Sequence, residues 1–400
     1  MVRSSLIGNE PISHRPGYDE GFCFERGPDC VYNTTMTYIT ELHGSTERLY
    51  FQEHEIGTDL TQQWKLGIKG SWPARYLVSG NLIYGAAGSK KGVAAWSFDS
   101  ADSVWCRDDI LFETALDFSV FDNLLHCYYD QGDGRDPYWI NAITGEDVDL
   151  PFQEYGPPLG SIDGNMLIST DQGLTIVCPR ELGSKGIIPN TGYTWGLVHA
   201  VENSLIALTM IDGQEMAIAR INIETGDYEW VNKGVRAIPM YIDDKYVVIS
   251  SYGESPGLWN AVIDIHSGEE IWRLPPRLPF TGANNPIFID AEKDMLIAIS
   301  VPYYDCTDGI FCCRLSTGDP LWSHSWKRSS GSGSLFVTGR LVWLVEPVDE
   351  KKRDLVVRSI ETGDEISRKR IPGASVRIEW IEGSRVLMRS GKSLYCYTSD

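Results

Sequence analysis

The sequence predicts an all-β fold, a β-propeller built from four-stranded blades. Two observations carry this prediction. First, apolar, β-branched and aromatic runs of roughly four to eight residues, such as "YVVIS" (246–250), alternate with loops rich in Gly, Asp, Asn and Pro, which is typical of strands rather than helices. Second, one sequence pattern recurs at intervals of roughly 40 to 50 residues, the period of a four-stranded propeller blade.

The recurring pattern contains an apolar run, a Ser/Thr-Gly turn, and a short run that ends in Trp. Five copies align on the turn glycine: "WINAITGEDVD" (139–149), "RINIETGDYEW" (220–230), "VIDIHSGEEIW" (262–272), "CCRLSTGDPLW" (312–322) and "VRSIETGDEIS" (357–367). The last four turn glycines are 42, 50 and 45 residues apart. Because glycine adopts a positive φ without steric cost, the Thr-Gly pair predicts a hairpin between the last two strands of each blade.

Weaker copies extend the repeat toward the amino terminus. They lie at 54–64 and 95–105, and seven internal copies can be counted in all. The 81-residue interval from Gly145 to Gly226 leaves room for one more copy near 173–186. The spacing therefore indicates a ring of seven or eight units.

Both ends of the chain carry strand-like remnants, at 34–55 and 384–400. We expect the termini to combine into one closing blade, because closure removes exposed edge strands that would invite aggregation. This gives eight blades, with seven as the alternative because the copies near Leu60 and Glu181 are weak. Residues 1–30, rich in Pro, Gly and Glu, are predicted to form an N-terminal extension before a single propeller domain over 31–400.

Charge and composition restrict the class of protein. The 55 acidic and 35 basic residues give a net charge of −20, which disfavours nucleic acid and anionic membranes as ligands. The chain shows no secretory signal and no apolar stretch of the roughly 20 residues that a membrane helix needs. Nine cysteines, an odd number without framework spacing, indicate free thiols in a reducing compartment. We therefore expect a cytoplasmic protein.

The charge is unevenly distributed along the sequence. Between Asp99 and Asp163 there are 15 acidic residues against only Arg107 and Arg135. Such a segment can be an ordinary solvated surface. A concentrated field of one sign can also steer a basic partner into place.

The pattern Asp-x-x-Thr-Gly-x-x-x-Trp resembles the repeat of the quinoprotein-like propellers, named for alcohol dehydrogenases that bind pyrroloquinoline quinone (PQQ). The copy "DIHSGEEIW" (264–272) matches it best, and the resemblance spans roughly residues 45–400. It implies that the repeat tryptophans dock between neighbouring blades, and the residues at that position are Trp64, Trp105, Trp230, Trp272 and Trp322. Replacing one by Ala is expected to cost about 3–5 kcal/mol of stability without touching any chemistry.

Two copies of the repeat lack this tryptophan. Asp149 and Ser367 take its place, so we expect those blade boundaries to be looser.

The resemblance also gives a test for catalysis, since enzymes of this family use a calcium ion, a quinone, an aspartate base and a vicinal disulfide. Cys312 and Cys313 are adjacent, but Cys313 aligns with the apolar positions Ile140 and Ile263 of other copies. Successive side chains of a strand point to opposite faces, so we interpret both cysteines as packing residues. The loop "DQGDGRDP" (130–137) lacks the bidentate Glu of a calcium loop.

No zinc spacing, phosphate loop, or nucleophile with its base is found in the sequence. We therefore predict no catalytic, metal or cofactor-binding residues, no cofactor, and no enzymatic activity.

These features predict a non-enzymatic propeller that binds another protein, of basic character, such as a toxin neutralised by an immunity-type protein. The resemblance implies an assembly scaffold as an alternative, and an enzyme or small-molecule binder using the central channel also stays open. Aromatic anchors within a charged rim are the usual energetic centre of an interface. The candidate contact residues are accordingly Asp108, Asp109, Asp130, Asp133, Asp136 and Tyr138.

Overall fold

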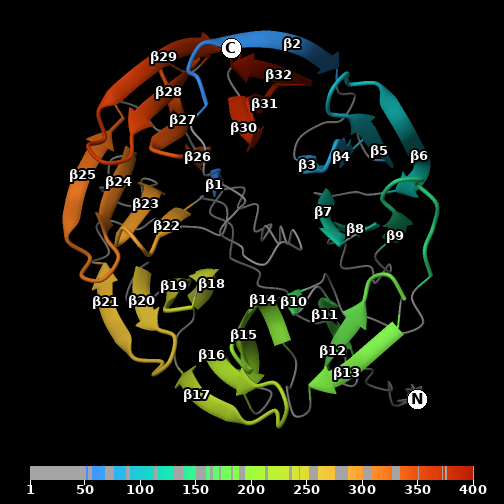
Figure 1. Cartoon of the computed structure of the whole chain (residues 1–400), viewed down its shortest axis with the longest axis vertical. Coiled ribbons are helices and arrows are strands. Elements are labelled where there is room, and N and C mark those ends of the chain that lie inside the picture. Colours follow the sequence, from blue (N-terminus) through green and yellow to red (C-terminus); the bar gives the residue numbers. More distant parts are fainter. Residues whose placement is uncertain are drawn as a thin grey trace, which may run out of the picture.

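The chain folds into a ring of eight β-sheets, each of which is one propeller blade (Figure 1). The structure, a computed structural model, describes residues 51–52, 56–67, 76–86, 91–111, 116–121, 123–129, 138–149, 159–162, 165–170, 173–181, 183–188, 194–211, 215–233, 237–242, 244–251, 260–274, 287–300, 309–326, 334–349, 351–371, 373 and 376–399. All the regular elements in these ranges are strands. The predicted all-β propeller of eight blades is therefore confirmed.

Three blades follow one another in the first half of the ring. Their strands are β3 (Tyr76–Ser79), β4 (Leu82–Ala86), β5 (Lys91–Ser97) and β6 (Ser103–Leu111); β7 (Leu116–Phe121), β8 (Leu124–Tyr129) and β9 (Tyr138–Asn141); and β10 (Gly160–Ile162), β11 (Asn165–Thr170), β12 (Gly173–Cys178) and β13 (Gly183–Ile188). In the middle blade an isolated bridge between Ile140 and Asp147 marks the place of the outermost strand.

Four blades complete the continuous part of the ring. Their strands are β14 (Thr194–Val201), β15 (Ser204–Ile211), β16 (Glu215–Asn222) and β17 (Tyr228–Lys233); β18 (Ala237–Ile242), β19 (Tyr246–Ser251), β20 (Asn260–Asp264) and β21 (Glu270–Leu274); β22 (Ile287–Asp290), β23 (Met295–Ser300), β24 (Gly309–Arg314) and β25 (Pro320–Ser325); and β26 (Leu335–Thr338), β27 (Leu341–Pro347), β28 (Arg353–Ser359) and β29 (Glu365–Ile371). Within each blade, consecutive strands pair as antiparallel neighbours.

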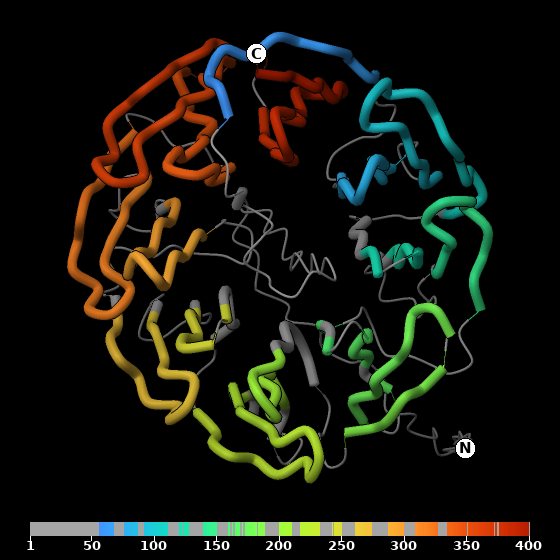
Figure 2. The backbone as a smooth tube through the Cα atoms, in the orientation of Figure 1, coloured from blue at the N-terminus to red at the C-terminus, as the bar shows by residue number. Residues whose placement is uncertain are grey.

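The eighth blade combines strands from both ends of the chain. Its order is β2-β32-β31-β30, where β2 (Leu60–Gly67) pairs antiparallel with β32 (Ser393–Ser399), and β31 (Arg385–Ser390) and β30 (Val376–Glu382) complete the sheet. Figure 2 shows the early segment, in blue, passing along the rim beside the last strand, in red. We call this sheet the closing blade.

A short strand, β1 (Phe51–Gln52), precedes the closing blade. It pairs in parallel with β26, where Phe51 faces Val337 and Gln52 faces Thr338. The β26–β29 sheet therefore has five strands, and β1 lies at its inner edge (Figure 1). The predicted N-terminal extension, residues 1–30, lies outside the described residues, so that domain boundary stays a prediction.

The apolar core lies between neighbouring blades rather than in one central cluster. For example, Tyr84 and Val93 of one blade share a buried cluster with Leu125 and Ile140 of the next. Alternating strand residues supply the two faces of each blade, so every blade contributes to two boundaries. The described residues contain no helix of the length and apolarity that a membrane crossing requires.

Candidate functional site

The repeat turn shapes the outer edge of each blade, and the turn at Gly145 is representative. The Asn141 side-chain oxygen accepts hydrogen bonds from the backbone N–H groups of Ile143 and Thr144, both at 3.0 Å. The N–H of Gly145, which has a φ of 77°, donates to the Asn141 carbonyl at 2.8 Å. This closed turn projects Ile143, Thr144 and Glu146 into solvent.

The turn also receives the tryptophan of the preceding blade. The Trp105 indole N–H donates to the Ala142 carbonyl at 3.0 Å. A Cβ atom built on Gly145 would lie only 2.8 Å from Cδ2 of the Trp105 ring. Glycine is therefore required here for its positive φ and for the close approach of the ring.

The other four repeat tryptophans make the same indole hydrogen bond to the next blade. The accepting carbonyls are those of Phe98 for Trp64, Ile265 for Trp230, Leu315 for Trp272 and Ile360 for Trp322. Five boundaries thus share one clamp, which we call the Trp–turn clamp. It fixes the position of each outer strand relative to the next turn.

The two copies without tryptophan face blades that lack the five-residue turn between their last two strands. After Asp149, the next blade joins β12 to β13 by a shorter loop, with Cys178 paired directly to Gly183. After Ser367, the closing blade has no hairpin at this position, because β32 and β2 come from distant parts of the chain. The missing tryptophans therefore coincide with missing receptors.

An exposed acidic surface lies on the β3–β6 and β7–β9 blades. Seven exposed carboxylates of the described residues define it, and we call them the acidic rim: Asp99, Asp102, Asp108, Asp109, Glu146, Asp147 and Asp149. Among the described residues, two arginines form ion pairs with it. Arg385 pairs with Asp99 at 2.7 Å, and Arg107 lies between Asp109 and Asp147.

Arg107 organises the centre of the acidic rim. Its Nε and Nη2 donate to the two Asp109 carboxylate oxygens at 2.8 and 2.7 Å, and its Nη1 donates to Asp147 at 2.8 Å. The same Nη1 donates to the Gly145 carbonyl at 3.0 Å, which ties β6 to the next blade. Arg107 is 20% exposed, whereas Asp109 and Asp147 are 61% and 63% exposed. Two carboxylates are thus held in place with most of their surface open.

Electrostatics keep this group charged. Hydrogen bonding to Arg107 lowers the pKa of Asp109 to about 2, and the two carboxylates raise the pKa of Arg107 above its ordinary value. Arg107 and Asp109 are therefore both ionised at neutral pH. Two large apolar side chains of the same region are also exposed, Val104 on β6 at 49% and Ile143 in the turn at 55%.

The predicted contact residues are placed unevenly by the structure. Asp108 and Asp109 lie on β6 within the acidic rim. Asp130, Asp133 and Asp136 lie outside the described residues, and of Tyr138 only the backbone, the first residue of β9, is described. Sequence reasoning missed Glu146 and Asp147, although "TGED" places both directly after a turn glycine that the repeat had identified.

Cys312 and Cys313 are free thiols buried in the wall of a blade. They lie on β24, are 0% and 2% exposed, and belong to two different clusters on opposite faces of the sheet. Burial raises the pKa of each thiol to about 12. The two sulfurs thus point apart, as expected for packing residues in a regular strand. Among the described residues, no group of three or more His, Cys, Asp or Glu is placed to hold a metal ion.

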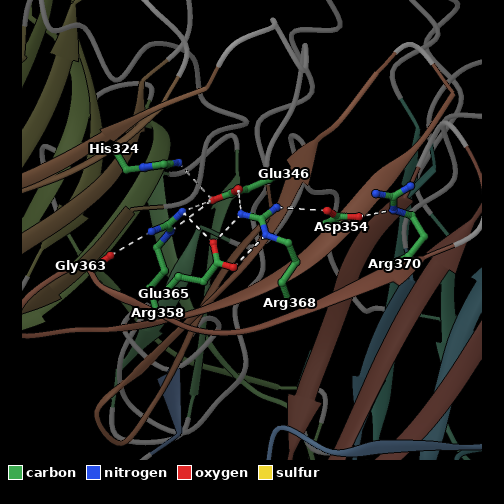
Figure 3. A network of polar contacts seen from close by, with 8 residues as sticks. All are labelled: His324, Glu346, Asp354, Arg358, Gly363, Glu365, Arg368 and Arg370. Atoms are coloured by element: carbon green, nitrogen blue, oxygen red, sulfur yellow. Dashed lines mark hydrogen bonds and ion pairs between the residues drawn. The ribbon is translucent and has the colours of Figure 1, made fainter.

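A second charged cluster, in the β26–β29 blade, is buried and internally paired (Figure 3). Glu346 accepts hydrogen bonds from Arg358 and from Arg368, each at 2.8 Å. Arg368 also donates to Asp354 at 3.1 Å, and Arg370 bonds the other Asp354 oxygen. Glu346, Asp354 and Arg358 are each only 4% exposed.

The edge of this network is formed by two further side chains. Glu365 bonds Arg368 at 2.6 Å, and His324 of the preceding blade lies 3.9 Å from Glu346. Desolvation and the nearby Arg358 lower the pKa of His324, so the imidazole is neutral at neutral pH. The acids and the arginines balance one another, and we refer to the set as the buried ion network.

No protein family and no curated protein matches this sequence. Several solved structures are similar to it. BamB from Moraxella catarrhalis has a TM-score of 0.54 and 16% identity, covering 85% of this chain and 100% of that one. Quinohemoprotein alcohol dehydrogenase from Comamonas testosteroni has a TM-score of 0.55 and 12% identity, covering 87% and 78%. A europium-containing methanol dehydrogenase has a TM-score of 0.53 and 11% identity, covering 88% and 96%.

Some of these neighbours are named as dehydrogenases, whereas BamB is not named as an enzyme. The similarity therefore shows the fold and not an activity. The eight-bladed ring and the repeat turn agree with it. The chain therefore has the fold of the quinoprotein-type, PQQ-repeat β-propellers.

Proposed function

We propose that this chain is a non-enzymatic propeller that binds a basic protein through the acidic rim. The observation that carries the proposal is the placement of seven exposed carboxylates on two neighbouring blades, with Arg107 and Arg385 as their only described cationic contacts. A surface of one sign accelerates encounter with a partner of the opposite sign and disfavours other partners.

Apolar side chains beside the charges support a protein partner over a nucleic acid or a membrane. Val104 and Ile143, about half exposed, can be covered by a partner surface, and buried apolar anchors usually supply most of an interface's binding energy. A net charge of −20 repels both nucleic acid and anionic lipid. The favoured partner is thus a basic polypeptide with an apolar contact surface.

The specific role that we favour is neutralisation of a basic toxin in the cytoplasm, as an immunity-type protein does. A carboxylate-rich rim can cover the cationic surface that a toxin needs to attack nucleic acid or membranes. An assembly scaffold is the second candidate, because propellers resembling this one without a catalytic set serve that role. A neutralising protein blocks the activity of one partner, whereas a scaffold holds two or more partners at once.

The test compares a rim variant with a matched control. In the rim variant Asp108, Asp109 and Asp147 are changed to Asn, and in the control the exposed turn acids Asp227, Asp319 and Asp364 are changed to Asn. The rim variant and the control therefore lose the same number of negative charges. Tagged proteins are used to capture partners from lysate of the source organism at about 50 mM and about 500 mM salt, and captured proteins are identified by mass spectrometry.

We expect a basic protein to be retained at low salt by the wild type and the control and to be lost by the rim variant. Its association rate, measured with purified components, should fall steeply as salt rises. Retention by the rim variant, or equal loss by the control, would rule out the rim as the binding surface. A purified partner whose activity persists in the complex would favour the scaffold over the neutralising protein.

A further inference from the structure

The boundary between the β26–β29 blade and the closing blade is built differently from the boundaries with a Trp–turn clamp. Ser367 of β29 stands at the tryptophan position, and no hairpin joins β32 to β2 to receive an indole. The ring is also closed non-covalently within the closing blade itself, where β2 pairs with β32 from Leu60 opposite Ser399 to Gly67 opposite Ser393. Something else must hold this boundary.

The segment that precedes β2 contacts the β26–β29 blade at two described places. Its first part, β1, adds a parallel strand to the inner edge of β26. Further along, Ile56 and Leu60 are each 6% exposed. They belong to a cluster of 15 buried residues, the largest described in the molecule, which includes Trp343 and Leu355 of the β26–β29 blade. We call residues 51–52 and 56–60 the strap.

The same cluster reaches into the closing blade. It includes Ile378 of β30, Met388 of β31 and Tyr397 of β32. Ile56 and Leu60 therefore pack where the two blades meet, and they supply apolar surface that elsewhere comes from a repeat tryptophan. Burying such side chains removes apolar surface from water, which stabilises the boundary.

A polar contact complements this packing. Lys369 of β29 donates from Nζ to the Leu60 carbonyl, and its ammonium lies 5.8 Å from the centroid of the Tyr397 ring. Lys369 stands two residues after Ser367. At the equivalent position, two residues after a repeat tryptophan, Arg107 donates to the Gly145 carbonyl and Asn232 to the Gly268 carbonyl. Lys369 thus makes the corresponding side-chain hydrogen bond, but its acceptor is a carbonyl of the strap.

We propose that the face of the β26–β29 blade next to the closing blade is a docking site for the strap, and that the strap is the latch of the ring. The occupant is this chain's own amino-terminal segment. When the strap is docked, β2 is held on both sides, by β32 within its sheet and by the β26–β29 blade through Leu60. When it is released, β2 loses its contacts with the β26–β29 blade and keeps its pairing with β32, so the ring opens there first.

Hydrogen exchange with mass spectrometry tests the latch. In one variant Ile56 and Leu60 become Ala, and in a milder one Lys369 becomes Met, which keeps an unbranched side chain and removes the donor. The matched control changes Leu208 and Ile249 to Ala, two buried residues that share a cluster between the β14–β17 and β18–β21 blades. Exchange of paired amides reports local opening in each blade separately.

We expect exchange about tenfold faster or more at β2, β32 and β26 in the double strap variant, with unchanged rates at β14–β21. Lys369→Met should raise the same rates to a smaller extent, and the control should raise rates at β14–β21 alone. If the double variant fails to fold, Lys369→Met decides. An even rise over all blades, or wild-type rates at β2 and β32 in the variants that fold, would overturn the latch.

Discussion

Two parts of this propeller contain many charged residues and use them in opposite ways. In the buried ion network, Glu346, Asp354 and Arg358 are each 4% exposed. Their charges are paired within the same blade, where Arg368 and Arg370 supply the remaining counter-ions. In the acidic rim, carboxylates that are more than 60% exposed share a single arginine, Arg107. The network stabilises one blade, whereas the rim presents a field to solvent.

The comparison shows that the charge of a sequence segment does not measure the charge of a surface. Residues 327–392 contain 14 basic and 9 acidic residues, which reads as a basic region. Yet Arg358, Arg368 and Arg370 are committed to buried or half-buried carboxylates of the same blade. In the described contacts of the rim, only Arg107 and Arg385 pair with its seven carboxylates. Most of its negative charge therefore remains available to a ligand.

Removing the centre of the buried ion network should have the largest effect on stability. Glu346→Ala leaves Arg358 buried without its principal counter-ion, and breaking a buried pair in this way typically costs about 3–5 kcal/mol. Urea unfolding of the variant and the wild type measures the loss. Partner binding by the folded fraction should be unchanged, because the closing blade separates the network from the nearest blade of the rim (Figure 1).

The control is Glu365→Ala on the same network. Glu365 is 39% exposed, so its pair with Arg368 is screened by solvent and should contribute about 1 kcal/mol or less. If Glu346→Ala cost no more than Glu365→Ala, burial would not be what makes the network important.

Acid should weaken the rim side of the ring through a buried histidine. His126 of β8 is 1% exposed and lies against Trp139, with ring centroids 4.5 Å apart. Desolvation lowers its pKa from 6.5 to about 3. Between these values the unfolded chain binds the proton and the folded chain does not, so stability falls as pH drops below 6.5, by about 1.4 kcal/mol per pH unit, and levels off near pH 3.

Unfolding free energies measured from pH 7 to pH 4.5 check this slope. His126→Phe removes the titrating group and should flatten the pH dependence by about the same amount, whereas His324→Gln, at a side chain that is 41% exposed, should leave most of it. Equal slopes in the wild type and in His126→Phe would show that other groups dominate acid unfolding.

The repeat made much of the architecture predictable, because its signals are local. Asn141, Thr144 and Gly145 form their turn from five consecutive residues. In three copies a tryptophan four residues after the turn glycine marks the outer strand, at Trp230, Trp272 and Trp322. The turn at Gly318 could not be fully predicted from its own residues. It begins with Arg314 instead of Asn or Asp, and Asp294 of an earlier hairpin accepts the Ser316 N–H at 2.6 Å in its place.

The candidate site was less predictable for the same reason. Asp108 and Asp109 could be chosen from the acidic segment, but the pairing of Asp147 with Arg107 joins residues 40 positions apart on two blades. Likewise, the two-residue strand β1 carries no periodicity that a sequence could reveal, and its partner β26 lies nearly 300 residues away. Contacts between blades, rather than strands within them, were the missing information.

The smallest stability effect should come from the rim itself. Asp109→Asn and Asp147→Asn each remove one exposed partner of Arg107, and exposed pairs contribute about 0–1 kcal/mol, so unfolding free energies should stay within about 1 kcal/mol of the wild type. Arg107→Met should cost more than either, because it also removes the bond to the Gly145 carbonyl that ties two blades together. Urea unfolding of the three variants ranks them. A loss above about 2 kcal/mol in either aspartate variant would mean that the rim, like the network, is primarily a stabilising device, and the contrast between the two regions would disappear.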